Sequence, residues 1–141
     1  MAIRFHSLKI SYNLKSKNLH KSWIRSCIDS MGKSCGELSF IFTSNLSLRE
    51  MNRKYLNHDY FTDVITFDYS EDALISGDIF ISIDQVKINA GIFRTEEDEE
   101  LRRVMIHGVL HLLGFQDSTD AEKAQMRKLE NDALHLWLKG V

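Results

Sequence analysis

Residues 104–117, with the sequence VMIHGVLHLLGFQD, restrict the fold more than any other part of the chain. If this stretch is helical, apolar side chains cover nearly its whole circumference, so the helix must be central and buried. These apolar residues are Val104, Met105, Ile106, Val109, Leu110, Leu112 and Leu113. His107 and His111 lie four residues apart and project from one face of the helix. Burying an unpartnered polar ring costs about 1–3 kcal/mol, so both imidazoles require compensation.

A shared metal ion would compensate both histidines. Gly114 supports this interpretation, because glycine readily adopts the left-handed conformation that ends a helix and turns the chain back over its last turn. Asp117 would then return to the histidine face and complete a three-ligand site, with a fourth position left for water. Nitrogen and oxygen donors favour Zn²⁺, with Ni²⁺, Fe²⁺ or Mn²⁺ as alternatives. The sequence therefore predicts one divalent ion held by His107, His111 and Asp117.

Other interpretations of the same residues stay open at this stage. Histidines that line a core are often held by backbone carbonyls or carboxylates without any metal. Asp117 comes shortly before the last predicted helix, where an aspartate commonly caps backbone N–H groups. Asp120 is a competing oxygen donor for the third ligand position.

The whole chain, residues 1–141, is predicted to form one domain, because it has the usual single-domain length and no repeat or linker. Hydrophobic periodicity and capping residues predict strands over 3–11, 38–43, 64–69 and 79–83 and helices over 16–31, 47–57, 95–113 and 119–138, with another helix starting near Ser82. Ser47 and Thr95 are the expected caps of their helices. The order predicts an α+β fold in which about four strands form a mixed sheet, packed by about five helices.

Composition limits the classes of function. The chain has 18 Lys and Arg against 20 Asp and Glu, a formal net charge of -2, so nucleic-acid binding would need a local basic patch. Cys27 and Cys35 are expected to be reduced thiols. No apolar run approaches the roughly 20 residues of a transmembrane helix, and no signal peptide is apparent. We therefore expect a cytoplasmic protein without membrane contact.

The run HGVLHLLGFQD resembles the signature HGxLHLxGYDH of the YbeY family, bacterial metal-dependent endoribonucleases of ribosomal RNA maturation. Residues 52–55 resemble the N-x-x-Y segment of that family, residues 62–67 its TDVLSF segment and residues 76–79 its LGDI segment, together covering roughly residues 45–130. The histidine spacing is also similar to the metzincin protease motif HExxHxxGxxH. In this chain, however, Gly108 stands in the position of the general-base glutamate of that motif, which makes a peptidase the weakest alternative.

Two departures from the family pattern concern its function. Asp117 stands where the family has a third histidine, which adds negative charge and should alter metal preference. The family commonly has Arg-x-Lys-Asp after its tyrosine, whereas this chain has Leu56-Asn57-His58-Asp59, so an arginine expected near substrate phosphate is missing. Whether Arg53, Lys54 or His58 takes its place is open.

The resemblance implies a single-strand-specific endoribonuclease of ribosomal RNA maturation and ribosome biogenesis, with the ribosome or a ribosomal subunit as a partner. The second candidate is a non-catalytic ribosome-associated module with a structural metal. The nucleophile is expected to be a metal-bound water or the ribose 2′-hydroxyl. The candidate bases His58, Asp63 and Asp78 are suggested by polarity alone, and none is assigned.

Contact with RNA is expected from the region between residues 49 and 61. Arg49, Arg53 and His58 supply its basic side chains, interleaved with aromatic rings able to stack on unpaired bases: Tyr55, Tyr60 and Phe61. The basic residues of the first helix are expected to form a solvated surface, and Arg102 and Arg103 to pair with the acidic run that precedes them.

Overall fold

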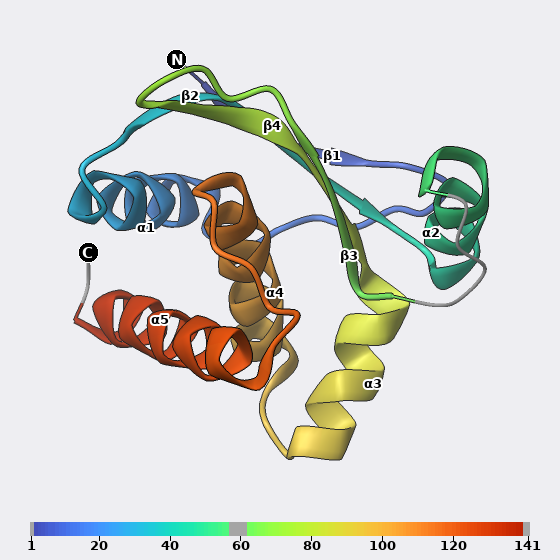
Figure 1. Ribbon diagram of the computed structural model, residues 1–141. Helices are drawn as coiled ribbons and strands as arrows, with labels where there is room; N and C mark the ends of the chain where they lie inside the picture. Colours follow the sequence, from blue (N-terminus) through green and yellow to red (C-terminus); the bar gives the residue numbers. More distant parts are fainter. Residues whose placement is uncertain (1, 57–61, 140–141) are drawn as a thin grey trace.

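The computed structural model describes residues 2–56 and 62–139, and within them one four-stranded sheet is packed on one face by helices (Figure 1). The strands are β1 (Ile3–Ser7), β2 (Ser34–Thr43), β3 (Val64–Asp68) and β4 (Leu74–Ser82), in the order β1-β2-β4-β3. β1 and β4 pair with β2 in parallel, and the edge strand β3 pairs with β4 antiparallel. The predicted α+β fold with a mixed sheet is confirmed.

The helices are α1 (Lys17–Ser30), α2 (Asn45–Met51), α3 (Ile83–Phe93), α4 (Glu97–Leu112) and α5 (Asp120–Leu138), with a π-helical turn η1 (Asn52–Leu56) after α2. α4 passes between the sheet and α5, and contacts α3, β3 and β4 as well (Figure 1). None of the described helices combines the length and the apolar character needed to span a membrane.

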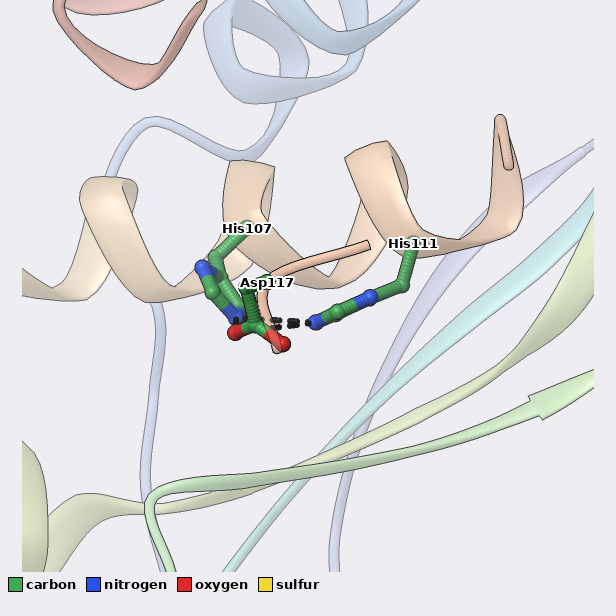
Figure 2. Close-up of side chains that lie close together, drawn as sticks. All are labelled: His107, His111 and Asp117. Carbon is green, nitrogen blue, oxygen red and sulfur yellow. Dashed lines mark hydrogen bonds and ion pairs between the residues drawn. The ribbon is translucent and has the colours of Figure 1, made fainter. Parts of the chain in front are cut away.

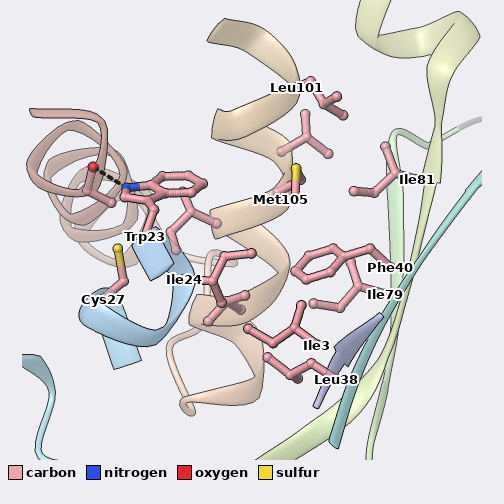
Figure 3. Packing of buried hydrophobic residues seen from close by; sticks show 14 of the residues in the cluster. Ile3, Trp23, Ile24, Cys27, Leu38, Phe40, Ile79, Ile81, Leu101 and Met105 are labelled. Carbon is pink, nitrogen blue, oxygen red and sulfur yellow. Dashed lines mark hydrogen bonds between the residues drawn. The ribbon is translucent and has the colours of Figure 1, made fainter. Parts of the chain in front are cut away.

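The core lies between the sheet and α1 and α4, as Figure 3 shows. Leu38 and Phe40 of β2 face Met105 of α4 in this cluster, and all three side chains are fully buried. Gly108 allows α4 to approach the sheet closely, because a Cβ atom there would lie 2.8 Å from Cγ2 of Ile79 on β4. The predicted burial of the apolar residues of the histidine-bearing helix is confirmed, since Val104, Met105, Ile106, Val109, Leu110 and Leu112 are all buried.

Several predicted boundaries are wrong by a few residues. Ser44, not Ser47, caps α2, and its side chain accepts a hydrogen bond from the Ser47 amide. α4 begins after Glu96 without a side-chain cap, so Thr95 does not cap it. By contrast, the last helix begins where it was predicted, and Thr119 caps α5 through a capping box with Glu122. β4 starts five residues earlier than predicted, at Leu74 instead of Ile79, because a tight turn closes over residues 71–74.

The helix predicted over residues 47–57 changes type partway along. The π-helical turn over Asn52–Leu56 shifts the register of the side chains, so Asn52 is buried whereas Tyr55 is exposed. Regular helical spacing from the buried Leu48 predicts that Tyr55 packs inward, and this prediction is wrong because of the π-helical turn. Cys27 and Cys35 are free thiols, as predicted.

Candidate metal centre

His107, His111 and Asp117 converge on one point beside α4 (Figure 2). The Nε2 atoms of the two histidines are 3.0 Å apart. Oδ2 of Asp117 lies 3.2 Å from Nε2 of His107 and 3.6 Å from Nε2 of His111. In the described part of the chain, this is the one group of three potential metal-ligating side chains whose donor atoms come this close together.

The end of α4 explains how Asp117 reaches the histidines. Gly114 has a φ of 102°, in the left-handed region that was predicted for it. Its amide donates to the carbonyl of His111, and the amide of Phe115 donates to the carbonyl of Leu110. This pair of hydrogen bonds is the Schellman motif, which reverses the chain direction at a helix end. The reversal carries Asp117 back along α4 to the face that bears both rings.

The outer nitrogen atoms of both imidazoles are engaged as donors. Nδ1 of His107 lies 2.6 Å from Oε2 of Glu130 on α5, and Nδ1 of His111 lies 3.0 Å from the carbonyl oxygen of Phe115. A carbonyl oxygen and a carboxylate can only accept, so Nδ1 carries the proton in each ring. In a neutral ring Nε2 therefore carries a lone pair, and the lone pairs of both rings point toward Asp117.

The three converging atoms are Nε2 of His107, Nε2 of His111 and Oδ2 of Asp117. When both rings are neutral, all three are acceptors, so they need a shared proton or cation as a common partner. Ligands about 2.0–2.1 Å from a tetrahedral Zn²⁺ ion are about 3.3–3.4 Å apart, close to the three separations found here. The donor set, its spacing and the fixed tautomers thus fit a divalent metal ion.

Glu130 is a site residue that the sequence analysis missed. It is 5% exposed, and its other oxygen, Oε1, lies 2.9 Å from Nη1 of Arg103. Burial raises the pKa of the Glu130 carboxyl, but the hydrogen bonds from His107 and Arg103 outweigh burial and hold that pKa below its usual range. Burial lowers the pKa of His107, and here the hydrogen bond and charge of Glu130, with the charges of Asp63 and Asp117, raise it above its usual range.

The expected pairing of Arg103 with the acidic run before it is wrong. Its guanidinium group lies 2.9 Å from Glu130 and 2.9 Å from Asn131, both on α5. Arg102 stacks on the ring of Trp137 at 4.3 Å. Both arginines therefore join α4 to α5.

The competing roles for the aspartates can now be compared. The cap of α5 is Thr119, so the structure does not use Asp117 as that cap. Asp120 is exposed in the first turn of α5 and is not part of the converging group. Asp63 lines a cavity of about 250 Å³ together with His107 and Glu130, and burial raises the pKa of its carboxyl. Asp78 lines a different cavity, beside the rings of Phe67 and Phe80.

The predicted RNA-contacting residues lie on α2 and η1, apart from the converging group. Arg49 is half-buried near the end of α2, and Arg53 is exposed in η1. His58, Tyr60 and Phe61 fall outside the described residues, so the structure does not place these predicted residues.

An open cavity of about 320 Å³ borders the candidate centre. It is lined by His107, Asp117, Lys123, Met126, Arg127 and Glu130. A ligand in this cavity can therefore reach two of the three converging residues, His107 and Asp117, from the side of α5.

Known proteins resemble this chain in sequence and in fold. The family model described as Endoribonuclease YbeY matches residues 3–137. The endoribonuclease YbeY of Parabacteroides distasonis is 46% identical over 134 residues, 95% of this chain and 94% of that protein. That of Bacteroides thetaiotaomicron is 42% identical over 134 residues, 95% of this chain and 98% of the relative. A protein of Thermotoga maritima, solved in solution, has the same fold, with a TM-score of 0.67 and 24% identity over 96% of this chain and 89% of its own.

Proposed function

This chain belongs to the endoribonuclease YbeY family, and we propose that it is a metal-dependent endoribonuclease that cuts single-stranded ribosomal RNA during ribosome maturation. Its proposed metal ligands are His107, His111 and Asp117. Membership of the family supports the endoribonuclease activity. The observation that carries the metal dependence is the convergence of the two histidine Nε2 atoms and a carboxylate oxygen, which are all acceptors when the rings are neutral.

A bound divalent ion supplies Lewis acidity, which polarises a phosphoryl oxygen and makes water acidic enough to act as a nucleophile near neutral pH. The side chains of this protein orient that chemistry. Glu130 and the carbonyl of Phe115 hold the two rings with Nε2 facing inward, so the donors are arranged before any ion arrives. Two nitrogen donors and one oxygen donor at tetrahedral spacing favour Zn²⁺, with Ni²⁺, Fe²⁺ or Mn²⁺ as alternatives.

Asp117 gives this centre a different charge from one with three histidines. A carboxylate in the third position lowers the net positive charge around the ion by one unit, so the ion withdraws less electron density from its other ligands. Asp117 therefore shifts metal preference toward ions that accept oxygen donors well.

For RNA contact we propose Arg49, Arg53 and His58, in the segment where the family resemblance also falls. The exposure of Arg53 and of the neighbouring Tyr55 ring supports this, because an arginine beside an accessible ring can contact phosphate while the ring stacks on an unpaired base. The ribosome or one of its subunits is the expected partner, and the cytoplasm is the expected location.

The second candidate function is a ribosome-associated module whose metal is structural. Leu56, which stands where the family commonly has an arginine, favours this alternative. Cleavage of labelled single-stranded ribosomal RNA separates the two functions. The parent protein and His135→Ala, which alters an exposed histidine of α5, should cut the RNA, whereas His111→Ala should remain folded and lose cleavage. Cleavage by His111→Ala at the parent rate, or no cleavage by the folded, metal-loaded parent, would refute the proposed activity.

A further inference from the structure

We propose that Lys123 and Arg127 of α5 bind the phosphate backbone of the RNA next to the metal centre and supply the positive charge that Leu56 does not provide. This inference rests on the proposed function, since it concerns the substrate of the same site. It assigns a substrate-binding role to two residues outside the segment of Arg49, Arg53 and His58.

The position of the two side chains is the first argument. They lie four residues apart on α5 and therefore on the same face of the helix. Both line the open cavity of about 320 Å³ that also contains His107 and Asp117. A phosphate group lying over the candidate metal centre would thus have two cationic side chains along one wall of the cavity.

The availability of these charges is the second argument. The ammonium group of Lys123 makes no hydrogen bond or ion pair with any residue in the described part of the chain. Arg127 has one ion pair there, 3.8 Å from Oε1 of Glu130, and its side chain is 57% exposed. Because that same oxygen already accepts a hydrogen bond from Arg103 at 2.9 Å, Arg127 is held only weakly. Both cations can therefore turn toward an incoming anion.

Arg103 differs from this pair although it lies nearby. Its two terminal nitrogen atoms are each 2.9 Å from an acceptor, one on Glu130 and one on Asn131. Its side chain is only 21% exposed. Moving Arg103 to a phosphate would break two hydrogen bonds and leave the buried Glu130 carboxylate short of a partner, so its role is structural.

The charge balance of the site is the third argument. Compared with the family pattern, Asp117 in place of a histidine adds one negative charge, and Leu56 in place of an arginine removes one positive charge. Lys123 and Arg127 place two positive charges beside the same centre. The chain as a whole has a formal charge of -2 and cannot attract a polyanion without such a local patch.

Binding of a fluorescent single-stranded RNA, followed by anisotropy across a range of salt concentrations, tests this inference. The variants are Lys123→Gln, Arg127→Gln and the double variant. The control is Lys128→Gln on the same helix, where Lys128 is 76% exposed and pairs with Asp132 at 3.3 Å. Each lost phosphate contact should lower the salt slope by about 0.7 and weaken binding about 5-fold at about 0.1 M salt, and the double variant about 25-fold.

The inference predicts that Lys128→Gln binds as the parent does, and that the losses in the other variants are equal across RNA sequences, as expected of phosphate contacts. Because the substituted side chains are exposed, metal content and thermal unfolding should be unchanged. A double variant with the affinity and salt slope of the parent would overturn the inference, as would an equal loss in Lys128→Gln.

The outcome for the proposed function is separate. Cleavage by the parent, together with parent-like binding by the double variant, would leave the proposed function standing and refute the phosphate-binding role. If the parent binds RNA but cuts none, and the double variant loses binding, the phosphate-binding role is supported and the nuclease function is refuted.

Discussion

Replacing Glu130 by glutamine tests how the candidate metal centre is held together. In the folded protein, one carboxylate oxygen accepts from Nδ1 of His107 at 2.6 Å and the other from Arg103 at 2.9 Å. A glutamine of the same shape has one acceptor oxygen and one NH₂ donor. Either His107 or Arg103 must then face a donor, and the His107 ring loses its fixed orientation or its tautomer.

The expected size of the effect follows from these contacts. Removing a hydrogen-bond partner of a metal-binding histidine typically costs 10- to 100-fold in metal affinity. Arg103 already neutralises much of the charge of Glu130, so the loss arises mainly from the hydrogen bond and the ring orientation and little from long-range attraction. We therefore expect the lower end, about 10-fold or about 1.4 kcal/mol. The free energy of unfolding of the metal-free protein should fall by about 1–3 kcal/mol, because a buried donor is left unpaired.

Competition with a chromophoric chelator measures the metal affinity, and denaturant unfolding of the metal-free protein measures its stability. Asp132→Asn is the matched control, because Asp132 lies on the same helix, is exposed and pairs only with Lys128 among the described residues. It should change neither quantity by a measurable amount. If Glu130→Gln binds Zn²⁺ as tightly as the parent, the proposed role of Glu130 in orienting His107 is wrong.

Three further predictions concern packing and burial in the fold. Gly108→Ala should lower the free energy of unfolding by about 1–3 kcal/mol, because its Cβ would lie 2.8 Å from Ile79. Gly91→Ala should raise the free energy of unfolding by about 0.5–1 kcal/mol, because the added Cβ meets no atom within 4 Å. Equal effects of the two substitutions in denaturant unfolding would contradict the close packing at Gly108. Burial raises the pKa of the Cys27 thiol to about 12, so mass spectrometry should find it unmodified by a thiol reagent near neutral pH in the folded protein, and rapid labelling would show that the burial is wrong. Burial lowers the pKa of His20 despite its backbone hydrogen bonds, so the unfolded state binds more protons and stability should fall as the pH drops below about 6.5. His20→Gln should reduce this loss of stability at low pH. Identical pH profiles of stability for the parent and His20→Gln would contradict the lowered pKa of His20.

The candidate centre could be predicted from the sequence wherever its geometry is local. Helical spacing places His107 and His111 on one face, and Gly114 allows the reversal that brings back Asp117. Both relations span a few residues and depend on backbone conformations that the residue types favour. The apolar surroundings of the pair were equally predictable, because the apolar residues of this segment cover nearly the whole circumference of the helix.

Glu130 and Arg103 could not be predicted in the same way, because their contact depends on how α5 packs against α4, across 27 residues of sequence. One signal was present: Glu130 lies four residues after Met126 and three before Ala133, on the buried face of α5. A carboxylate on such a face requires a partner, and a histidine or arginine on the neighbouring helix would have been the natural candidate.

The errors at element ends have local causes. Both Ser44 and Ser47 can cap α2, and hydrophobic periodicity does not distinguish them. The π-helical turn that exposes Tyr55 inserts an extra residue into the helical repeat, which a constant helical period cannot represent. Of these two errors, only the one at the π-helical turn concerns function, because Arg53 and Tyr55 are expected to contact RNA.

The central claim is that His107, His111 and Asp117 hold one divalent ion, and elemental analysis tests it most directly. Protein prepared without chelators or nickel affinity resin, and His135→Ala prepared in the same way, should each carry about one divalent ion per chain. The folded His111→Ala variant should carry less than about a tenth of that amount after the same preparation. A folded parent that binds no stoichiometric ion even after dialysis against Zn²⁺, or a His111→Ala variant that retains the full amount, would contradict the claim.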